Sequence, residues 1–288
     1  MRSVVLAILI GAPTIVAAKP AATLAPATLA IDGGFLAAAK AHPSPEVLAA
    51  VSAEADKAMS EGPFAVTDKK ETPPSGDKHD YMSLAPYWWP NPATKDGLPY
   101  IRHDGETNPE RHKVPDDANF NHLENAVHAL GLGYYFTGKE EYAARAALLL
   151  RTWFLDPATR MNPNLNYAQA VLGVNDGRGT GLIDVRGIPR ILDGITLIEG
   201  SPSLTKEDRE GLRKWFTQYL DWLRNSKNGR DESDAKNNHG SWYDQQITGI
   251  ALFLGEKELD RLDLSGCDGP TEERSSNLSP DTGVGTLP

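Results

Sequence analysis

The residues best suited to proton chemistry lie late in the chain, in the run Asn237-Asn238-His239-Gly240-Ser241-Trp242-Tyr243. An imidazole titrates near neutral pH, so His239 can accept or donate a proton under ordinary conditions. The amides of Asn237 and Asn238 can bind a carboxylate or orient the ring. On a helix that begins near Asn238, His239 and Tyr243 share one face. The alternative is that the asparagines cap this helix and His239 is an ordinary polar residue of its first turn.

A second group of residues has the chemistry to hold a sugar. The segment Asp80-Tyr81-Met82-Ser83-Leu84-Ala85-Pro86 is followed directly by Tyr87-Trp88-Trp89-Pro90. Aromatic faces stack on the apolar faces of sugar rings, and the prolines restrict the loop that presents them. Packing is an equally good explanation of such a cluster. Basic residues around the loop suit an anionic polymer, although scattered surface charge explains them as well: Lys78, His79, Arg102, His103, Arg111, His112 and Lys113.

The glycine-rich run Gly177-Arg178-Gly179-Thr180-Gly181 has a different character. It lacks the Lys-Ser/Thr ending and the preceding strand of a phosphate loop, so we do not expect a nucleotide site. Arg178 or Arg186 can instead pair with a sugar carboxylate, because a guanidinium fork matches that group in shape.

Carboxylates offer a second type of chemistry. Asp80, Asp104 and Asp184 contain the pair that a glycoside hydrolase needs, although acidic residues are plentiful throughout the chain. The sequence has no HExxH motif and no Cys/His cluster. We therefore expect neither a metal site nor another cofactor.

Composition restricts the class of protein. A chain of 288 residues can bury a large core in one domain or at most two, and its 40% hydrophobic content is that of a globular protein. The net charge of -10 argues against nucleic acid as a partner, because phosphate binding needs a basic surface. An acidic substrate would need a local basic patch for the same reason.

The N-terminus has the pattern of a signal peptide over residues 1–18. Arg2 precedes an apolar run from Val4 to Val16, which is too short to span a bilayer, and small residues follow. This predicts secretion, to the periplasm if the source is bacterial, and no membrane attachment after processing. Residues 19–32 are expected to be a flexible lead-in. Cys267 is the only cysteine, so no intramolecular disulfide can form.

The spacing of apolar residues predicts helices nearly throughout the rest of the chain. Long irregular stretches over 62–115 and 155–184 are expected to be functional loops, and 225–238 to be a polar loop. No strand pair and no repeat stands out. The pattern predicts an all-α fold, a barrel or toroid of antiparallel helical hairpins. The expected helices are 44–59, 123–137, 142–153, 188–198, 205–223 and 240–254.

An ordered series of motifs resembles the alginate lyase domain of polysaccharide lyases. The resemblance covers about residues 33–262, and its order makes it more specific than any one motif. It favours a functional interpretation of His239. The motifs are Lys78-His79-Asp80-Tyr81-Met82-Ser83, Tyr87-Trp88-Trp89-Pro90, Gly97-Leu98-Pro99-Tyr100, Asp104-Gly105, Trp153-Phe154-Leu155, Met161-Asn162-Pro163-Asn164-Leu165, Gly177-Arg178-Gly179 and Asn237-Asn238-His239-Gly240.

The resemblance implies an (α/α) toroid that cleaves uronate polysaccharides by β-elimination without a cofactor. In this chemistry the carboxylate charge is neutralised, a base removes the C5 proton and an acid protonates the leaving O4. By similarity Asn238 helps to neutralise the carboxylate and His239 is the base or the acid. The substrate-binding residues implied or suggested by the sequence are Lys78, Tyr81, Tyr87, Trp88, Trp89, Arg178 and Tyr243.

The sequence departs from the family pattern after Tyr243. Family members continue with a Pro-Asp-Gly-Ser-Gln-Pro-like stretch, then an Arg and a catalytic Tyr, whereas this chain has Cys267–Pro288, rich in Gly, Ser, Thr and Pro. We expect a domain without its C-terminal helices, a disordered tail over 263–288, and weak or no lyase activity. A natural polar tail is the alternative, and Tyr243 is a candidate substitute for the missing Tyr.

The leading hypothesis is a secreted, monomeric lyase acting on an alginate- or glucuronan-like polymer. A noncatalytic protein that binds uronate polysaccharides would keep the aromatic loop but not need His239. An (α/α) glycoside hydrolase would depend on Asp80 or Asp184 instead.

Overall fold

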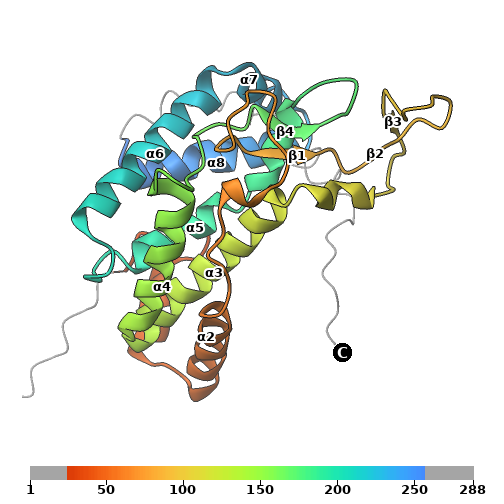
Figure 1. Cartoon of the computed structure of the whole chain (residues 1–288). Helices are drawn as coiled ribbons and strands as arrows, with labels where there is room; N and C mark the ends of the chain where they lie inside the picture. The colour runs from red at the N-terminus through yellow and green to blue at the C-terminus, as the bar shows by residue number, and fades with distance from the viewer. Residues whose placement is uncertain (1–24, 257–288) are drawn as a thin grey trace, which may run out of the picture.

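The computed structural model describes residues 25–256, and most of this part is helical (Figure 1). Short 3₁₀ segments and one π-helical turn, Arg151–Leu155, lie between the α-helices. In chain order the α-helices are α1 (Gly33–Ala41), α2 (Pro45–Ala58), α3 (Asp116–Thr137), α4 (Glu140–Leu150), α5 (Ile188–Leu197), α6 (Lys206–Asn225), α7 (Lys227–Ser233) and α8 (Asn238–Leu254).

Local signals in the sequence explain where several helices begin and end. The Ser44 hydroxyl accepts a hydrogen bond from the N–H of Val47 and Pro45 takes the first helical position of α2. Thr205 and Asp208 form a reciprocal capping box at the start of α6. Gly138 ends α3 in the left-handed conformation at φ 70°, which lets the chain turn into α4. These boundaries confirm the helices expected from the sequence.

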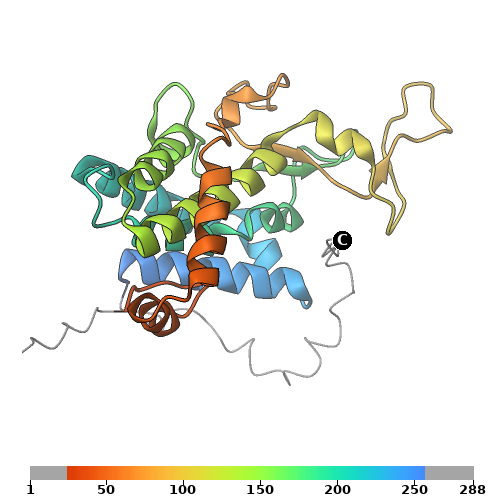
Figure 2. The ribbon, with the colours of Figure 1, turned by 90° about the horizontal axis from the view of Figure 1, so that it is seen from below.

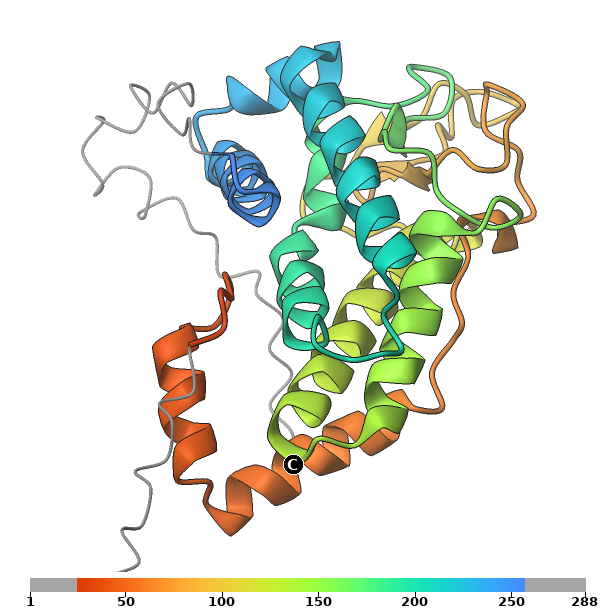
Figure 3. The same ribbon diagram turned by 90° about the vertical axis from the view of Figure 1, so that its left-hand side faces the viewer.

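The helices bury their apolar faces against one another around α3 and α5. Helix α3 contacts α2, α4 and α5, and α8 packs against α5 and α6. Figure 3 shows α3 and α4 as an antiparallel hairpin with α5 and α6 beside it. Large buried side chains such as Phe120, Trp153 and Phe216 fill the core. Burial of this apolar surface supplies the main stabilisation of the fold.

Two small sheets correct the expectation that the chain has no strand pair. Strand β1 (Met82–Leu84) pairs in parallel with β4 (Tyr167–Ala170), and β2 (Trp88–Trp89) pairs antiparallel with β3 (Ile101–Arg102). Segments this short leave no period that a sequence pattern can show. The first sheet joins the two long loops, and it lies below α7 in Figure 1.

Residues 86–108 form a projection that we call the aromatic arm. It extends from the helical body in two views, one from the front and one from below (Figures 1 and 2). Asn108 closes its base, because its backbone N–H donates to the carbonyl of Pro86 (2.7 Å) and its side-chain amide donates to the carbonyl of Trp88 (2.8 Å). Asn108 itself is buried.

A buried ion pair fixes the loop that leads to this arm. The Lys69 ammonium lies 2.9 Å from a carboxylate oxygen of Asp116, the first residue of α3, and both side chains are fully buried. Asp116 also accepts a hydrogen bond from the N–H of Met82 (3.0 Å). Burial raises the pKa of Asp116 to about 6, against the opposing effect of Lys69. The pair therefore ties the start of β1 to the start of α3.

The lead-in and the polar loop are more ordered than the sequence suggested. Residues 227–233 of the expected loop form helix α7. The backbone N–H groups of Ala30 and Ile31 donate to the buried carboxylate of Asp193, at 3.0 and 3.2 Å, so the end of the lead-in is held rather than flexible. The signal peptide over 1–18, Cys267 and the tail over 263–288 lie outside the described residues. Within 25–256, no helix has the length and apolar character needed to cross a membrane.

Candidate active site

His239 and Glu232 form a close pair where α7 meets α8. The imidazole Nδ1 lies 2.6 Å from Oε1 of Glu232, whose side chain is 1% exposed, whereas the imidazole is 22% exposed. Asn237 caps α8 by accepting a hydrogen bond from the N–H of His239 (3.1 Å). The turn between the two helices therefore places the imidazole over a buried carboxylate with one edge open to solvent.

This geometry fixes the role of each ring nitrogen. A carboxylate that accepts from Nδ1 selects the tautomer in which Nδ1 carries the hydrogen and Nε2 keeps a lone pair. The same carboxylate stabilises the imidazolium that forms when Nε2 takes a proton. The pair can therefore transfer a proton at Nε2.

Arg178 lies beside this pair. The residue that follows it, Gly179, packs against α7 so closely that an added Cβ would lie 2.8 Å from the carbonyl oxygen of Asn228 and 3.2 Å from the backbone nitrogen of Glu232. Only glycine permits this approach. Burial lowers the pKa of Arg178, and the positive charge of Arg102 lowers it further, while Asp184 and Glu232 oppose both effects. The charges of the arm, the loop and α7 therefore act on one guanidinium.

Four side chains form a buried polar network under Arg178: Tyr81, Ser83, Gln169 and Asp184. One carboxylate oxygen of Asp184 accepts from the hydroxyls of Ser83 (2.6 Å) and Tyr81 (3.2 Å). Its other oxygen accepts from the Gln169 amide (2.8 Å), and the Gln169 carbonyl oxygen accepts from the Arg178 guanidinium (2.9 Å). Burial raises the pKa of Asp184, against the effect of the bonds from Ser83 and Gln169. The network holds Arg178 through a neutral group.

The aromatic arm approaches the same place through Arg102. This residue pairs with Trp88 across β2 and β3, and it lies close enough to Arg178 to lower the pKa of that residue. The N–H of Tyr100 donates to the carbonyl of Leu172 (2.9 Å), which joins the arm to the loop that carries Arg178. Tyr87, Trp88 and Trp89 are all partly exposed. A second positive charge therefore stands near Arg178, with rings on the strand beside it.

Comparisons with known proteins agree with this arrangement. A sequence model of the family described as "Alginate lyase" matches residues 65–261. The chain belongs to the alginate lyase family. A crystal structure of an alginate lyase from Bacteroides ovatus is similar, with 43% sequence identity and a TM-score of 0.78. The similarity covers 81% of this chain and 63% of that one, so the chain spans less than two thirds of that lyase. No curated protein matches the sequence.

The likeness to this lyase confirms the predicted all-α fold of the (α/α) toroid type. The candidate site also lies inside the matched region, since Arg178, Glu232 and His239 all fall within residues 65–261.

The structure separates the predicted site residues into two groups. It brings Arg178, Asn238 and His239 together at α7 and α8, with Tyr81 below them in the network. Tyr81 is fully buried, so its hydroxyl supports Asp184 and does not face solvent. The Asn238 amide makes no hydrogen bond to another part of residues 25–256 and is partly exposed. It is therefore available to a ligand.

The polar groups of Lys78 and Tyr243, both predicted to bind substrate, are instead hydrogen-bonded within the protein. The Lys78 ammonium donates to the carbonyls of Lys69 (2.7 Å) and Lys70 (3.0 Å), which closes the loop on itself. Tyr243 is buried and its hydroxyl donates to the carbonyl of Leu223 (3.2 Å), between α6 and α8. Burial also raises the pKa of Tyr243. These contacts favour packing roles for both residues.

The carboxylates considered for a glycoside hydrolase are engaged elsewhere. Asp80 is buried and accepts hydrogen bonds from Ser75 (2.7 Å), Asn162 (2.9 Å) and Asn164 (3.1 Å). Asp184 is saturated by the buried polar network, and exposed Asp104 pairs with Arg102 at 3.0 Å. This arrangement leaves none of the three as an uncommitted acid or base. Among the described residues, no group of three His, Cys, Asp or Glu side chains is placed to hold a metal ion.

Sequence reasoning missed Glu232 and Gln169. Glu232 precedes His239 by seven residues, but the polar run around it predicted a loop, so no helix face connected the two. Gln169 is the third residue of the short strand β4, and the packing of β4 against the 3₁₀ segment Gly179–Val185 brings it to Asp184. A helix assigned to 227–233 would have revealed the Glu232–His239 contact, whereas the Gln169–Asp184 contact depends on tertiary structure.

Proposed function

We propose that this protein is a polysaccharide lyase that cleaves a uronic-acid polymer by β-elimination. The observation that carries the proposal is the His239–Glu232 pair beside Arg178, a guanidinium whose hydrogen-bond partner is a neutral amide. Membership of the alginate lyase family and the similar Bacteroides ovatus alginate lyase support it. A proton-transfer group next to a cation is the arrangement that removal of a proton beside a carboxylate requires.

The residues divide the chemical work as follows. Arg178 and the Asn238 amide bind the sugar carboxylate and reduce its negative charge, which makes the neighbouring C5–H more acidic. His239 Nε2 takes that proton. The C5–H electron pair becomes the C4=C5 double bond, and O4 leaves with the electrons of the C4–O4 bond and takes up a proton from water. Glu232 holds the imidazole in orientation and balances its positive charge.

The aromatic arm supplies the polymer-binding surface in this proposal. Tyr87, Trp88 and Trp89 are partly exposed, and the Trp89 ring packs against His103 at a centroid distance of 6.1 Å. Rings held this way can stack on sugars next to the reacting unit. An extracellular polymer also fits the expectation of secretion, which sequencing the N-terminus of the exported protein would test near Lys19.

The decisive experiment adds the purified full chain to alginate and to glucuronan and follows the absorbance of the unsaturated product. Product formed by the wild type and lost in His239→Ala would support the proposal. The same assay measures the level of turnover, which the sequence led us to expect to be weak or absent. Reducing ends without unsaturation would identify a hydrolase instead.

Retention on a uronate matrix with no product would identify a binding protein. In that case Trp88→Ala should abolish retention, whereas His239→Ala should not. A protein that neither binds nor cleaves either polymer would refute the proposal.

A further inference from the structure

We infer that Gln169 is a positioning residue that holds Arg178 without neutralising it, and so makes the site selective for acidic sugars. This inference rests on the proposed function and adds a residue that acts through another. The neutral Gln169 carbonyl oxygen, not a carboxylate, accepts the hydrogen bond from Arg178 Nη2 (2.9 Å). A carboxylate at this position would form an ion pair with Arg178 and compete with a uronate.

The backbone of Gln169 indicates that its placement is strongly determined. Its φ is 49°, in the left-handed region that residues other than glycine rarely adopt, and it is the one non-glycine residue with positive φ among residues 25–256. A strained backbone conformation of this kind persists only where several surrounding contacts hold it in place. Such conformations are found most often at functional sites. Here the N–H of Gln169 donates to the Ser83 hydroxyl (2.7 Å), which in turn donates to Asp184 (2.6 Å).

The orientation of the Gln169 amide is fixed by its two partners. Its Nε2 donates to a carboxylate oxygen of Asp184 (2.8 Å), so its carbonyl oxygen must face Arg178. Gln169 is 6% exposed and Asp184 is 5% exposed, which excludes bulk water as a competing partner. The negative charge of Asp184 is therefore kept one side chain away from the guanidinium.

Helix α7 confines the guanidinium from the other side. Gly179 lies against the backbone of Glu232, and the Glu232 carboxylate is already bonded to His239. Of the two carboxylates that act electrostatically on Arg178, one is thus bonded to Gln169 and the other to His239. The guanidinium retains donors for an incoming anion.

A charge-swap variant tests this inference: Gln169→Glu combined with Asp184→Asn. The swap keeps the net charge and the pattern of hydrogen bonds, because the new amide at position 184 can accept from Ser83 and Tyr81 and donate to the new carboxylate at position 169. It changes only which group faces Arg178. We expect near wild-type thermal stability but a rise of about tenfold or more in KM for a polyuronate, with a smaller change in kcat. An unchanged KM would overturn the inference.

A second variant separates positioning from folding. Gln169→Gly suits the left-handed backbone and removes the side chain that holds Arg178, so it should fold with reduced stability, yet it should also raise KM. Gln218→Glu with Asp221→Asn makes the same exchange on the exposed face of α6 and should leave KM at the wild-type value. A merely structural role for Gln169 predicts that stability falls and KM does not rise.

A readout that needs no substrate keeps the two proposals distinguishable. Phenylglyoxal reacts with the neutral form of arginine, so mass spectrometry of the modified protein reports the state of Arg178. In the charge-swap variant the carboxylate should slow modification of Arg178 severalfold and leave other arginines unchanged. No slowing would refute the inference about Gln169, whereas failure of the wild type to bind or cleave polyuronates would refute the proposed function.

Discussion

The buried polar network and the aromatic arm support the same site in opposite ways. In the network, Asp184 accepts three side-chain hydrogen bonds in an interior closed to solvent. The arm is held mainly by backbone bonds at its base, and its Arg102–Asp104 pair is 60% and 74% exposed. Buried polar groups that are fully bonded define one geometry, whereas exposed ion pairs contribute little. The network therefore fixes the geometry of the buried side chains, whereas the arm extends an exposed surface away from the helical body.

This difference predicts what substitutions will change. Substitutions in and directly above the network should affect catalysis or folding strongly, because they remove or redirect hydrogen bonds of buried groups. Substitutions in the arm should affect polymer binding and leave the fold intact.

Glu232 offers the largest expected effect. Glu232→Gln keeps the shape of the side chain, but its amide can donate to His239 Nδ1 and so favours the tautomer with hydrogen on Nε2. The base is then blocked, and kcat should fall by about 10²- to 10⁴-fold. Steady-state kinetics on alginate or glucuronan would measure the loss. The matched control is Asp231→Asn, which lies on the exposed side of α7 and should keep wild-type kcat. Equal losses in both variants would break the assignment of Glu232.

Asp184 gives the next largest effect, and it acts on folding. Asp184→Ala leaves Tyr81, Ser83 and Gln169 without their shared acceptor, so the free energy of unfolding should fall by about 3 kcal/mol. Asp104→Ala removes an exposed carboxylate of the arm and should change it by less than about 0.5 kcal/mol. Urea denaturation of both variants measures the difference. Similar values would show that the arm is as tightly integrated as the network.

The sequence predicted the helical body well and the polar network poorly, for a physical reason. Helix boundaries depend on local signals such as Ser44-Pro45, Thr205 with Asp208, and Gly138, all within four residues of the contact they make. The Gln169–Asp184 and Ser83–Asp184 contacts join residues 15 and 101 positions apart. Asn238 and His239 were found because both lie in one helical turn, and Arg178 because a charged residue among glycines is conspicuous. Nothing local identified Gln169 or Glu232 as their partners.

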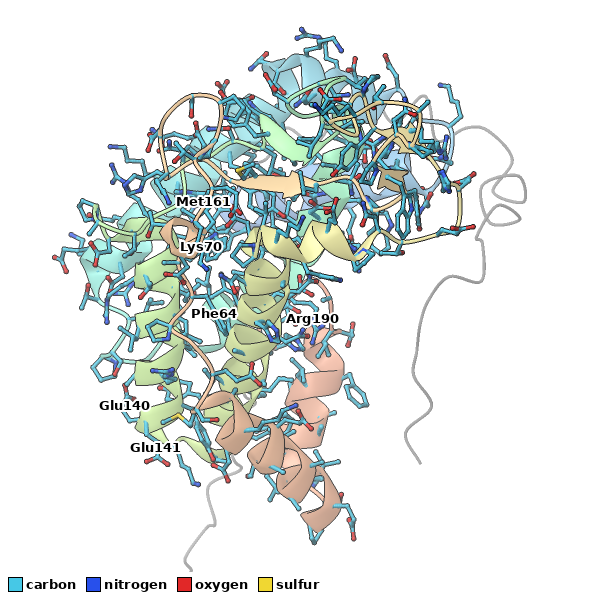
Figure 4. All side chains as sticks on the ribbon, turned by 45° about the vertical axis from the view of Figure 1, so that its right-hand side comes forward. Phe64, Lys70, Glu140, Glu141, Met161 and Arg190 are labelled. Carbon is cyan, nitrogen blue, oxygen red and sulfur yellow. The ribbon has the colours of Figure 1, made fainter. Side chains whose placement is uncertain are left out.

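The helical body that supports both regions responds to pH through His128. Burial and the positive charge of Arg190, which lies against α3 in Figure 4, together lower the pKa of His128 to about 4. The unfolded chain binds a proton near pH 6.5 and the folded protein near pH 4. Stability is therefore complete above pH 6.5 and is lost as the pH falls toward 4.

The loss attributable to His128 should reach about 3 kcal/mol across that pH window. Unfolding in urea at pH 7 and pH 5 should show a smaller decrease in His128→Gln than in the wild type. Exposed His122 provides the control, since His122→Gln should keep the wild-type dependence. A wild-type slope retained in His128→Gln would assign the pH dependence to other groups.

The smallest expected effect lies in the arm and sharpens the comparison most directly. Trp88 is partly exposed, and its backbone bonds to Arg102 and Asn108 do not depend on its ring. Trp88→Ala should therefore leave the unfolding free energy within about 1 kcal/mol of wild type and weaken retention on a uronate matrix by about tenfold. Trp88→Phe should restore most of the retention, because a ring is kept. If Trp88→Ala instead unfolded the protein, the arm would be part of the folding core. The contrast between a network that fixes the fold and an arm that does not would then be wrong.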